Sequence, residues 1–80
     1  MRNSSVGYVL VMCNPESVEN IIDEINTIDI VSETVQVDGA WKIVVKLVAK
    51  DLDQIRETIR WKLRKMIGIE STLTLIEYMA

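Results

Sequence analysis

Residues 31–49 read VSETVQVDGAWKIVVKLVA, and their pattern predicts a β-hairpin. Residues 31–37 alternate with a period of two, which is typical of a strand with one polar face. Asp38 and Gly39 form a hairpin turn signal, and Gly39 supplies the positive φ that such a turn needs. The return strand is predicted over residues 41–49, with one face made of Trp41, Ile43, Val45, Leu47 and Ala49. Its other face carries Lys42, Val44, Lys46 and Val48.

A strand and a helix are predicted before this hairpin. Residues 6–13 are a continuous, β-branched apolar run, which indicates a strand buried on both faces. Asn14 suits a helix N-cap, and Pro15 suits the first helical position. A helix to about Thr27 follows, because apolar residues recur there at helical spacing: Val18, Ile21, Ile22 and Ile25.

A second helix and a last strand are predicted after the hairpin. Asp51 is a candidate N-cap, with Gln54 as its capping-box partner. The apolar stripe of this helix is Leu52, Ile55, Ile59, Leu63 and Met66, and Gly68 fits the C′ position that ends it. The last strand covers residues 69–78. We expect its two faces to carry Ile69, Leu73 and Leu75 on one side and Thr72, Thr74 and Ile76 on the other.

The resulting order of elements is β-α-β-β-α-β, the ferredoxin-like split βαβ arrangement. We therefore predict an α+β fold in which a four-stranded antiparallel sheet carries two helices on one face. Right-handed crossovers place the first and third strands in the centre of the sheet. Residues 6–80 are expected to form a single domain, preceded by a disordered or extended N-terminus over residues 1–5.

The face of the sheet without helices is predicted to be apolar, because both alternating sets of the first strand are apolar. Large apolar patches are uncommon on monomers, so we expect dimerisation through the sheet. The alternative is a monomer with an exposed apolar patch. Trp61 lies opposite the apolar stripe of the second helix, either as an assembly contact or as a partly covered surface residue. The expected oligomer interface is Val9, Val11, Val44, Val48 and Trp61.

Composition excludes most catalytic chemistry. The 80 residues include 11 Ile, 10 Val and 6 Leu but no His, so His-based catalysis is ruled out. The single Cys excludes an internal disulfide and a cysteine metal cluster. Because no phosphate-binding glycine loop is visible either, we predict a protein that is not an enzyme and has no metal and no cofactor. A free Cys without an export signal or membrane span favours the cytoplasm.

Charge is distributed unevenly between the two predicted helices. The net charge is −3, and the first helix carries four acids and no base. Arg56, Arg60 and Arg64 follow one another at helical spacing on the second. This stripe is interpreted as a solvated face, or as a basic surface that attracts the acidic helix of another dimer. Nucleic-acid binding through the stripe is an alternative, although the open sheet face lacks the aromatic side chains of ferredoxin-like RNA binders.

Three stretches together resemble a known family: GYVLV at residues 7–11, TVQVDGAW at 34–41 and IGIESTLTLI at 67–76. The chain is similar, over residues 6–78, to the ligand-binding (RAM) domain of Lrp/AsnC-type transcription regulators. The resemblance implies sheet-to-sheet dimers, rings of dimers, and a small effector, commonly an amino acid. The residues before Val6 are too few for the family's helix-turn-helix. We therefore expect a stand-alone domain without direct DNA contact, with full-length regulators as candidate partners.

The resemblance also assigns the effector to the meeting point of two dimers, near the hairpin and the last strand. It points to Gly39, Trp41, Thr72 and Thr74. The family usually has an acidic residue after the hairpin aromatic, where this chain has Lys42. Either the ligand preference is inverted towards an anion, or effector binding is lost and only assembly is kept. These residues also have plain structural roles, as a turn residue, a packing aromatic and strand formers.

Overall fold

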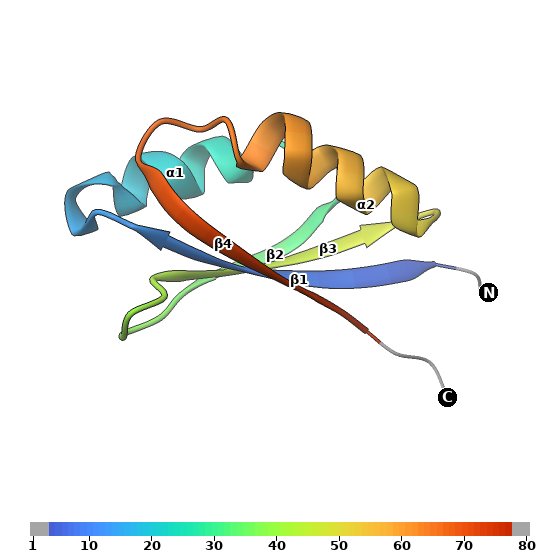
Figure 1. Cartoon of the computed structure of the whole chain (residues 1–80), viewed down its shortest axis with the longest axis horizontal. Coiled ribbons are helices and arrows are strands. Elements are labelled where there is room, and N and C mark those ends of the chain that lie inside the picture. The colour runs from blue at the N-terminus through green and yellow to red at the C-terminus, as the bar shows by residue number, and fades with distance from the viewer. Residues whose placement is uncertain (1–3, 78–80) are drawn as a thin grey trace.

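The computed structural model describes residues 4–77 and contains one four-stranded antiparallel sheet in the order β2-β3-β1-β4 (Figure 1). The strands are β1 (Ser5–Cys13), β2 (Val31–Gln36), β3 (Ile43–Ala49) and β4 (Ile69–Ile76). The helices are α1 (Val18–Ile25) and α2 (Leu52–Thr58), with a short 3-10 helix η1 (Pro15–Ser17) and a π-helical turn η2 (Ile59–Leu63). This is the predicted ferredoxin-like fold, with β1 and β3 in the centre.

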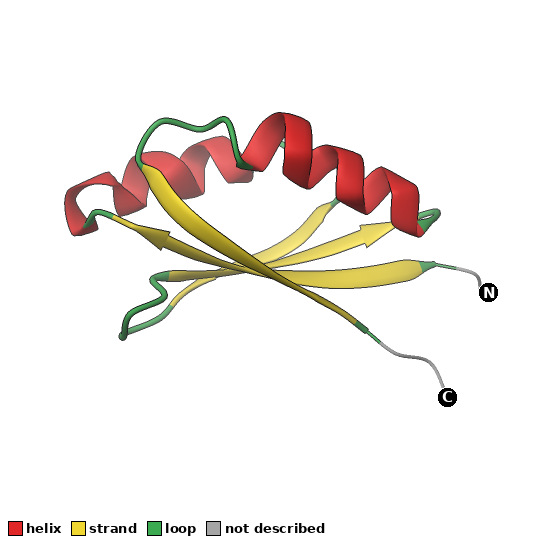
Figure 2. Ribbon diagram, viewed as in Figure 1, coloured by secondary structure: helices red, strands yellow, loops and turns green. Residues whose placement is uncertain are grey.

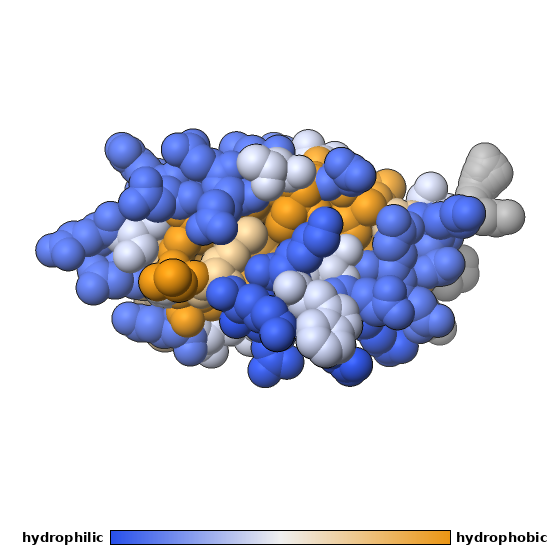
Figure 3. Space-filling model, turned by 90° about the horizontal axis from the view of Figure 1, so that it is seen from above, coloured by the Kyte–Doolittle hydropathy of each residue, from blue (hydrophilic) through white to orange (hydrophobic). Residues whose placement is uncertain are grey.

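Both helices cover the same face of the sheet, and the other face carries no helix (Figure 2). The core lies between these two layers. Its fully buried side chains come from the central strands and from the helical stripes: Val9, Val11, Ile43, Val45, Leu47, Ile21, Ile25, Ile55 and Leu63. The outer surface of the helical layer is mostly hydrophilic, with a hydrophobic strip between the two helices (Figure 3). No helix in the described part of the chain is long and apolar enough to cross a membrane.

The two predicted helix N-caps are confirmed. The Asn14 side chain accepts a hydrogen bond from the backbone N–H of Glu16 at 3.1 Å and begins η1, which leads into α1. Asp51 accepts one from the N–H of Gln54 at 2.9 Å. The side chain of Gln54 returns to the N–H of Lys50 at 3.4 Å, one residue before the cap. The bonds to Asn14 and Asp51 satisfy donors that the first turn of a helix leaves without a partner.

Removal of the Asp51 cap is expected to destabilise the domain. Asp51→Ala should lower the free energy of unfolding by about 1 kcal/mol, the usual loss for an N-cap. Asp53→Ala is the matched control, because Asp53 is exposed in the same first turn and is not the cap residue. Urea denaturation of both variants at one protein concentration measures the difference. Equal losses for the two variants would contradict a specific capping role.

The second helix changes its pitch halfway. The N–H of Arg64 donates to the carbonyl of Ile59 at 2.9 Å, which is the i→i+5 bond of a π-turn. The predicted apolar stripe is still buried through this change at Ile55, Ile59 and Leu63. The helical stretch ends at Leu63, and Gly68 lies with φ +101° in the turn before β4 rather than directly after the helix. A Cβ at Gly68 would lie 3.0 Å from the Ser17 hydroxyl, so this turn is closely packed.

The prediction that Val9 and Val11 face away from the helices is wrong. Both are fully buried under the helices, because their register partners in β3 are the core residues Val45 and Ile43. Cross-strand partners in a sheet share a face. Val44 instead pairs with Leu10, so the uncovered side of β1 is its other apolar set: Val6, Tyr8, Leu10 and Met12. Val44 and Val48 do lie on the uncovered side.

Two smaller differences concern the edge strands. A register shift at Met12 and Cys13 pairs Ile69 with buried Cys13, so Ile69 does not share a face with Leu73 and Leu75 as predicted. In β2, the hydroxyl of Thr34 donates to the Asn26 side chain at 2.9 Å, on the side of α1.

The N-terminal tail is shorter than predicted, because β1 begins at Ser5, inside the tail predicted for residues 1–5. Residues 1–3 and 78–80 lie outside the described residues.

Candidate functional site

An apolar row crosses the whole uncovered face of the sheet. It joins one residue from each strand through the pairing register: Val35, Val44, Leu10 and Leu73. The next row is Glu33, Lys46, Tyr8 and Leu75, so its charged half lies on β2 and β3. Val35, Leu73 and Leu75 are 41%, 44% and 50% exposed. We call the residues of these two rows, together with Val6, Met12 and Val48, the open sheet face.

The open sheet face is suited to packing against another sheet. β2 is an edge strand whose polar residues Thr34 and Gln36 pair with core residues of β3, while its apolar Val35 points away from the helices. This is the reverse of the usual pattern for a sheet with one solvated face. Two sheets that stack face to face about 10 Å apart would bury such side chains.

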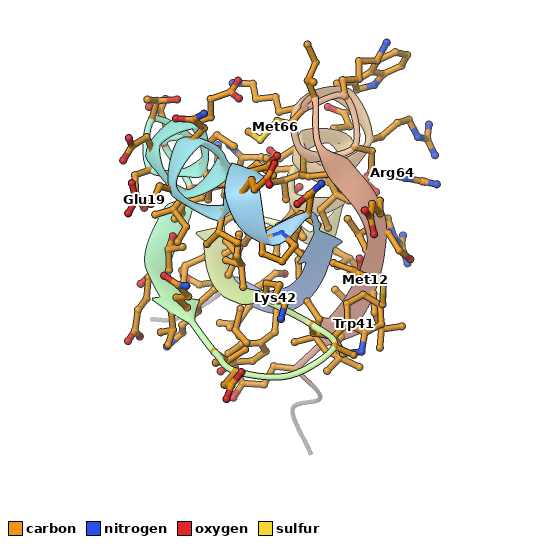
Figure 4. All side chains as sticks on the ribbon, turned by 90° about the vertical axis from the view of Figure 1, so that its left-hand side faces the viewer. Met12, Glu19, Trp41, Lys42, Arg64 and Met66 are labelled. Carbon is orange, nitrogen blue, oxygen red and sulfur yellow. The ribbon has the colours of Figure 1, made fainter. Side chains whose placement is uncertain are left out.

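The β2–β3 hairpin projects from one end of the open sheet face. Gly39 has the predicted positive φ, at +149°, although the connection is longer than the predicted two-residue turn, and the space around its missing Cβ is open to 4 Å. The predicted alternation of Trp41 with the core residue Ile43 is wrong, because residues 37–42 form a loop and β3 begins only at Ile43. Figure 4 shows Trp41 and Met12 on the side of the sheet opposite the helices. Trp41 is half-buried there.

Lys42 lies beside a hollow at the base of this hairpin. Its N–H donates to the carbonyl of Val11 at 2.9 Å, and its carbonyl accepts from Val37 at 2.9 Å, so its backbone is held on both sides. The hollow measures about 500 Å³ and is lined by Pro15, Val18, Gln36, Val37, Asp38 and Lys42. It therefore offers one carboxylate and one ammonium group at its rim.

Thr72 and Thr74 lie on the edge strand β4. They pair with Val11 and Val9, so they are on the side of the helices. Thr72 lines a hollow of about 260 Å³ with Arg64, Ile69, Glu70 and Ser71. Thr74 lines another of about 230 Å³ with Arg56, Ile59, Arg60, Arg64 and Ile76. Within a single chain, the five predicted ligand residues are thus divided between the β2–β3 hairpin and β4, with Val11 of β1 between Lys42 and Thr72.

Sequence similarity accounts for this architecture. Residues 6–78 match the model of the Lrp/AsnC ligand binding domain. The chain belongs to the Lrp/AsnC ligand-binding domain family. This match covers nearly the whole sequence and all four strands. No curated protein sequence is similar enough to the chain to count as a match.

Solved structures with the same fold include whole proteins and parts of longer regulators. TTHA0845 of Thermus thermophilus is 22% identical with a TM-score of 0.89, and 95% of each chain is covered. AsnC of E. coli is 18% identical with a TM-score of 0.87, covering 98% of this chain and 52% of AsnC. NMB0573 of Neisseria meningitidis, solved as a complex with L-Met, is 9% identical with a TM-score of 0.82, covering 94% and 50%. At these identities the likeness establishes the fold.

The cysteine of this Lrp/AsnC domain is a buried packing residue rather than a reactive thiol. Cys13 is buried at the end of β1. Burial raises the pKa of its thiol, the negative charge of Glu70 raises it further, and Lys42 opposes this rise. At neutral pH the group is therefore a thiol, which is a poor nucleophile and metal ligand compared with a thiolate.

Proposed function

We propose that the chain is a non-enzymatic, oligomerising module that binds a small molecule and modulates transcription regulators of the Lrp/AsnC type. The effector would be an amino acid or a related metabolite. The observation that carries the proposal is the open sheet face, with its apolar row across four strands. We propose that residues 6–80 form one domain, that two copies stack through this face, and that such dimers assemble further.

Assembly would also complete the effector site. Gly39, Trp41 and Lys42 belong to the β2–β3 hairpin, and Thr72 and Thr74 belong to β4, with β1 between Lys42 and Thr72. A contact between two dimers would bring the hairpin of one chain towards β4 of another, so residues that are separate in one chain would share a ligand. Trp61 is 58% exposed and is a further candidate for this contact.

The hollow beside Lys42 supports an amino-acid effector. A zwitterionic amino acid carries one ammonium and one carboxylate group, and the hollow offers Asp38 and Lys42 as opposite charges for them. The L-Met complex of NMB0573 shows an amino acid on a relative with this fold. Binding of the same effector to one assembly state more tightly than to another would shift the population of assemblies. Full-length regulators that expose a similar sheet face are the proposed protein partners.

Replacement of Lys42 by aspartate should remove the response to the effector. We expect at least one amino acid to raise the melting temperature of the wild-type protein, because a ligand at 100 times its Kd adds about 2.7 kcal/mol of stability. Lys42→Asp should lose most of this shift, since it replaces the ammonium group by a second carboxylate. A thermal-shift screen of amino acids and small carboxylates measures it.

Lys50→Asp is the matched control for this experiment. Lys50 is exposed, and the substitution makes the same change of charge away from the hairpin hollow. The control should keep the shift seen with the wild-type protein. If none of the compounds shifts the wild-type protein, the sensor function is wrong and the domain serves assembly alone.

A further inference from the structure

The basic residues of α2 and η2 divide between two sides of the helix. Lys62 and Lys65 line a hollow of about 310 Å³ towards α1, together with Glu24, Thr27, Ile28 and Met66. The ammonium group of Lys65 also lies 5.0 Å from the centre of the Trp61 ring. On this side, the acid Glu24 is available to balance the lysines. The lysine side of the helix therefore includes one carboxylate among the residues that line its hollow.

The arginine side faces β4 instead. Arg56, Arg60 and Arg64 all line the hollow of about 230 Å³ that also contains Thr74, Ile59 and Ile76. Among the described residues that line this hollow, none is acidic. Figure 4 shows Arg64 on the flank opposite the acidic residue Glu19 of α1. We call this hollow the arginine groove.

The π-turn explains why three arginines reach one groove. In an α-helix, residues four apart lie slightly more than one turn apart, so a stripe at this spacing drifts round the helix. A π-turn is wider, so four residues there cover less than one turn. The step from Arg56 to Arg60 lies mostly in α2, and the step from Arg60 to Arg64 lies in η2. The first step rotates past one full turn and the second stops short of one. The two rotations therefore offset each other, and Arg64 remains over β4.

We propose that the arginine groove binds a small organic dianion, such as a four-carbon dicarboxylate. Guanidinium groups present paired donors that match carboxylate and phosphate oxygens. Successive arginines stand about 6 Å apart along the helix, so two of them can each take one acidic group of the same molecule. The hydroxyl of Thr74 is a further donor, and Ile59 and Ile76 provide an apolar wall for the carbon chain.

The arginine groove, of about 230 Å³, is large enough to hold a small organic molecule. The groove is formed by one chain, so it needs no contact between dimers. It shares Thr74 with the amino-acid site proposed between dimers, but it does not depend on the contact that completes that site.

Calorimetric titration of the wild-type protein with succinate, inorganic phosphate and pyrophosphate tests this proposal. We expect succinate or pyrophosphate to bind more tightly than phosphate, because each spans two arginines. Arg60→Gln should weaken this binding about 10-fold or more, since it removes the central charged donor. Thr74→Val should weaken it less, about 3-fold to 10-fold, since a neutral hydroxyl is lost.

Lys62→Gln is the matched control, because it removes one positive charge from the same turn on the other side of the helix. It should leave the affinity for the dianion within about 2-fold of the wild-type value. The proposal is overturned if no dianion binds the wild-type protein, or if Lys62→Gln weakens binding as much as Arg60→Gln. It is also overturned if a short DNA or RNA duplex binds through Arg60 more tightly than the dianions do.

Discussion

Leu10→Lys is expected to convert the proposed sheet-to-sheet dimer into a monomer at micromolar concentration. Leu10 lies at the centre of the apolar row, between Val44 and Leu73. In a sheet-to-sheet dimer, each copy would place one lysine within the stacked faces, and burial of an unpaired charge costs several kcal/mol. Because each 1.4 kcal/mol is a factor of ten, the dissociation constant should rise by about 1,000-fold or more. Sedimentation equilibrium measures this change.

Ile67→Lys is the control for the loss of the dimer. Ile67 is 93% exposed in the turn before β4, so the same kind of substitution there should leave the dimer intact. Leu10 is not part of the buried core under the helices, and Leu10→Lys should therefore keep its secondary structure by circular dichroism. A monomeric wild-type protein, or equal dissociation of the two variants, would show that the open sheet face is not the dimer interface.

Ile55→Ala is expected to cause the largest loss of stability. Ile55 is fully buried in α2, and its methyl groups pack over Gly7 of the central strand β1. Truncation of a buried isoleucine to alanine usually costs about 2–5 kcal/mol, which is a large share of the total stability of a small domain. The melting temperature should fall by about 10 °C or more.

Ile67→Ala is the matched control, since it makes the same truncation at an exposed site. It should change the free energy of unfolding by less than about 0.5 kcal/mol. Denaturation at several protein concentrations separates loss of folding from loss of the dimer, because only the second depends on concentration. Similar losses for the two variants would argue against the helix-side core described above.

The sequence pattern was sufficient for the order and arrangement of the elements. The hairpin of residues 31–49 and the caps at Asn14 and Asp51 act locally, so their residue types specify their structure. The orientation of β1 could not be derived in the same way. Both of its alternating sets are apolar, and only the pairing of Val9 with Val45 determines which set meets the helices. Trp41 was misplaced because strand alternation does not continue through a loop.

The candidate sites depended even more on tertiary structure. The turn conformation at Gly39 and the basic stripe from Arg56 to Arg64 could be recognised in the sequence. The meeting of that stripe with Thr74 could not, because it requires a π-turn and the packing of η2 beside β4. The position of Lys42 and Thr72 on either side of Val11 likewise follows from the order and register of the strands rather than from any local motif.

The charged pair on the open sheet face has a consequence for partner choice. Glu33 and Lys46 stand opposite each other on β2 and β3. Their neighbours in the same row, Tyr8 and Leu75, are uncharged, so a partner can cover them without removing water from a charged group. A second sheet that shifted towards β2 would strip water from both charged groups, which is costly unless it offers new partners. The pair therefore discriminates against misaligned stacking and against apolar surfaces in general. The protein can therefore keep an exposed apolar sheet face and still bind few partners.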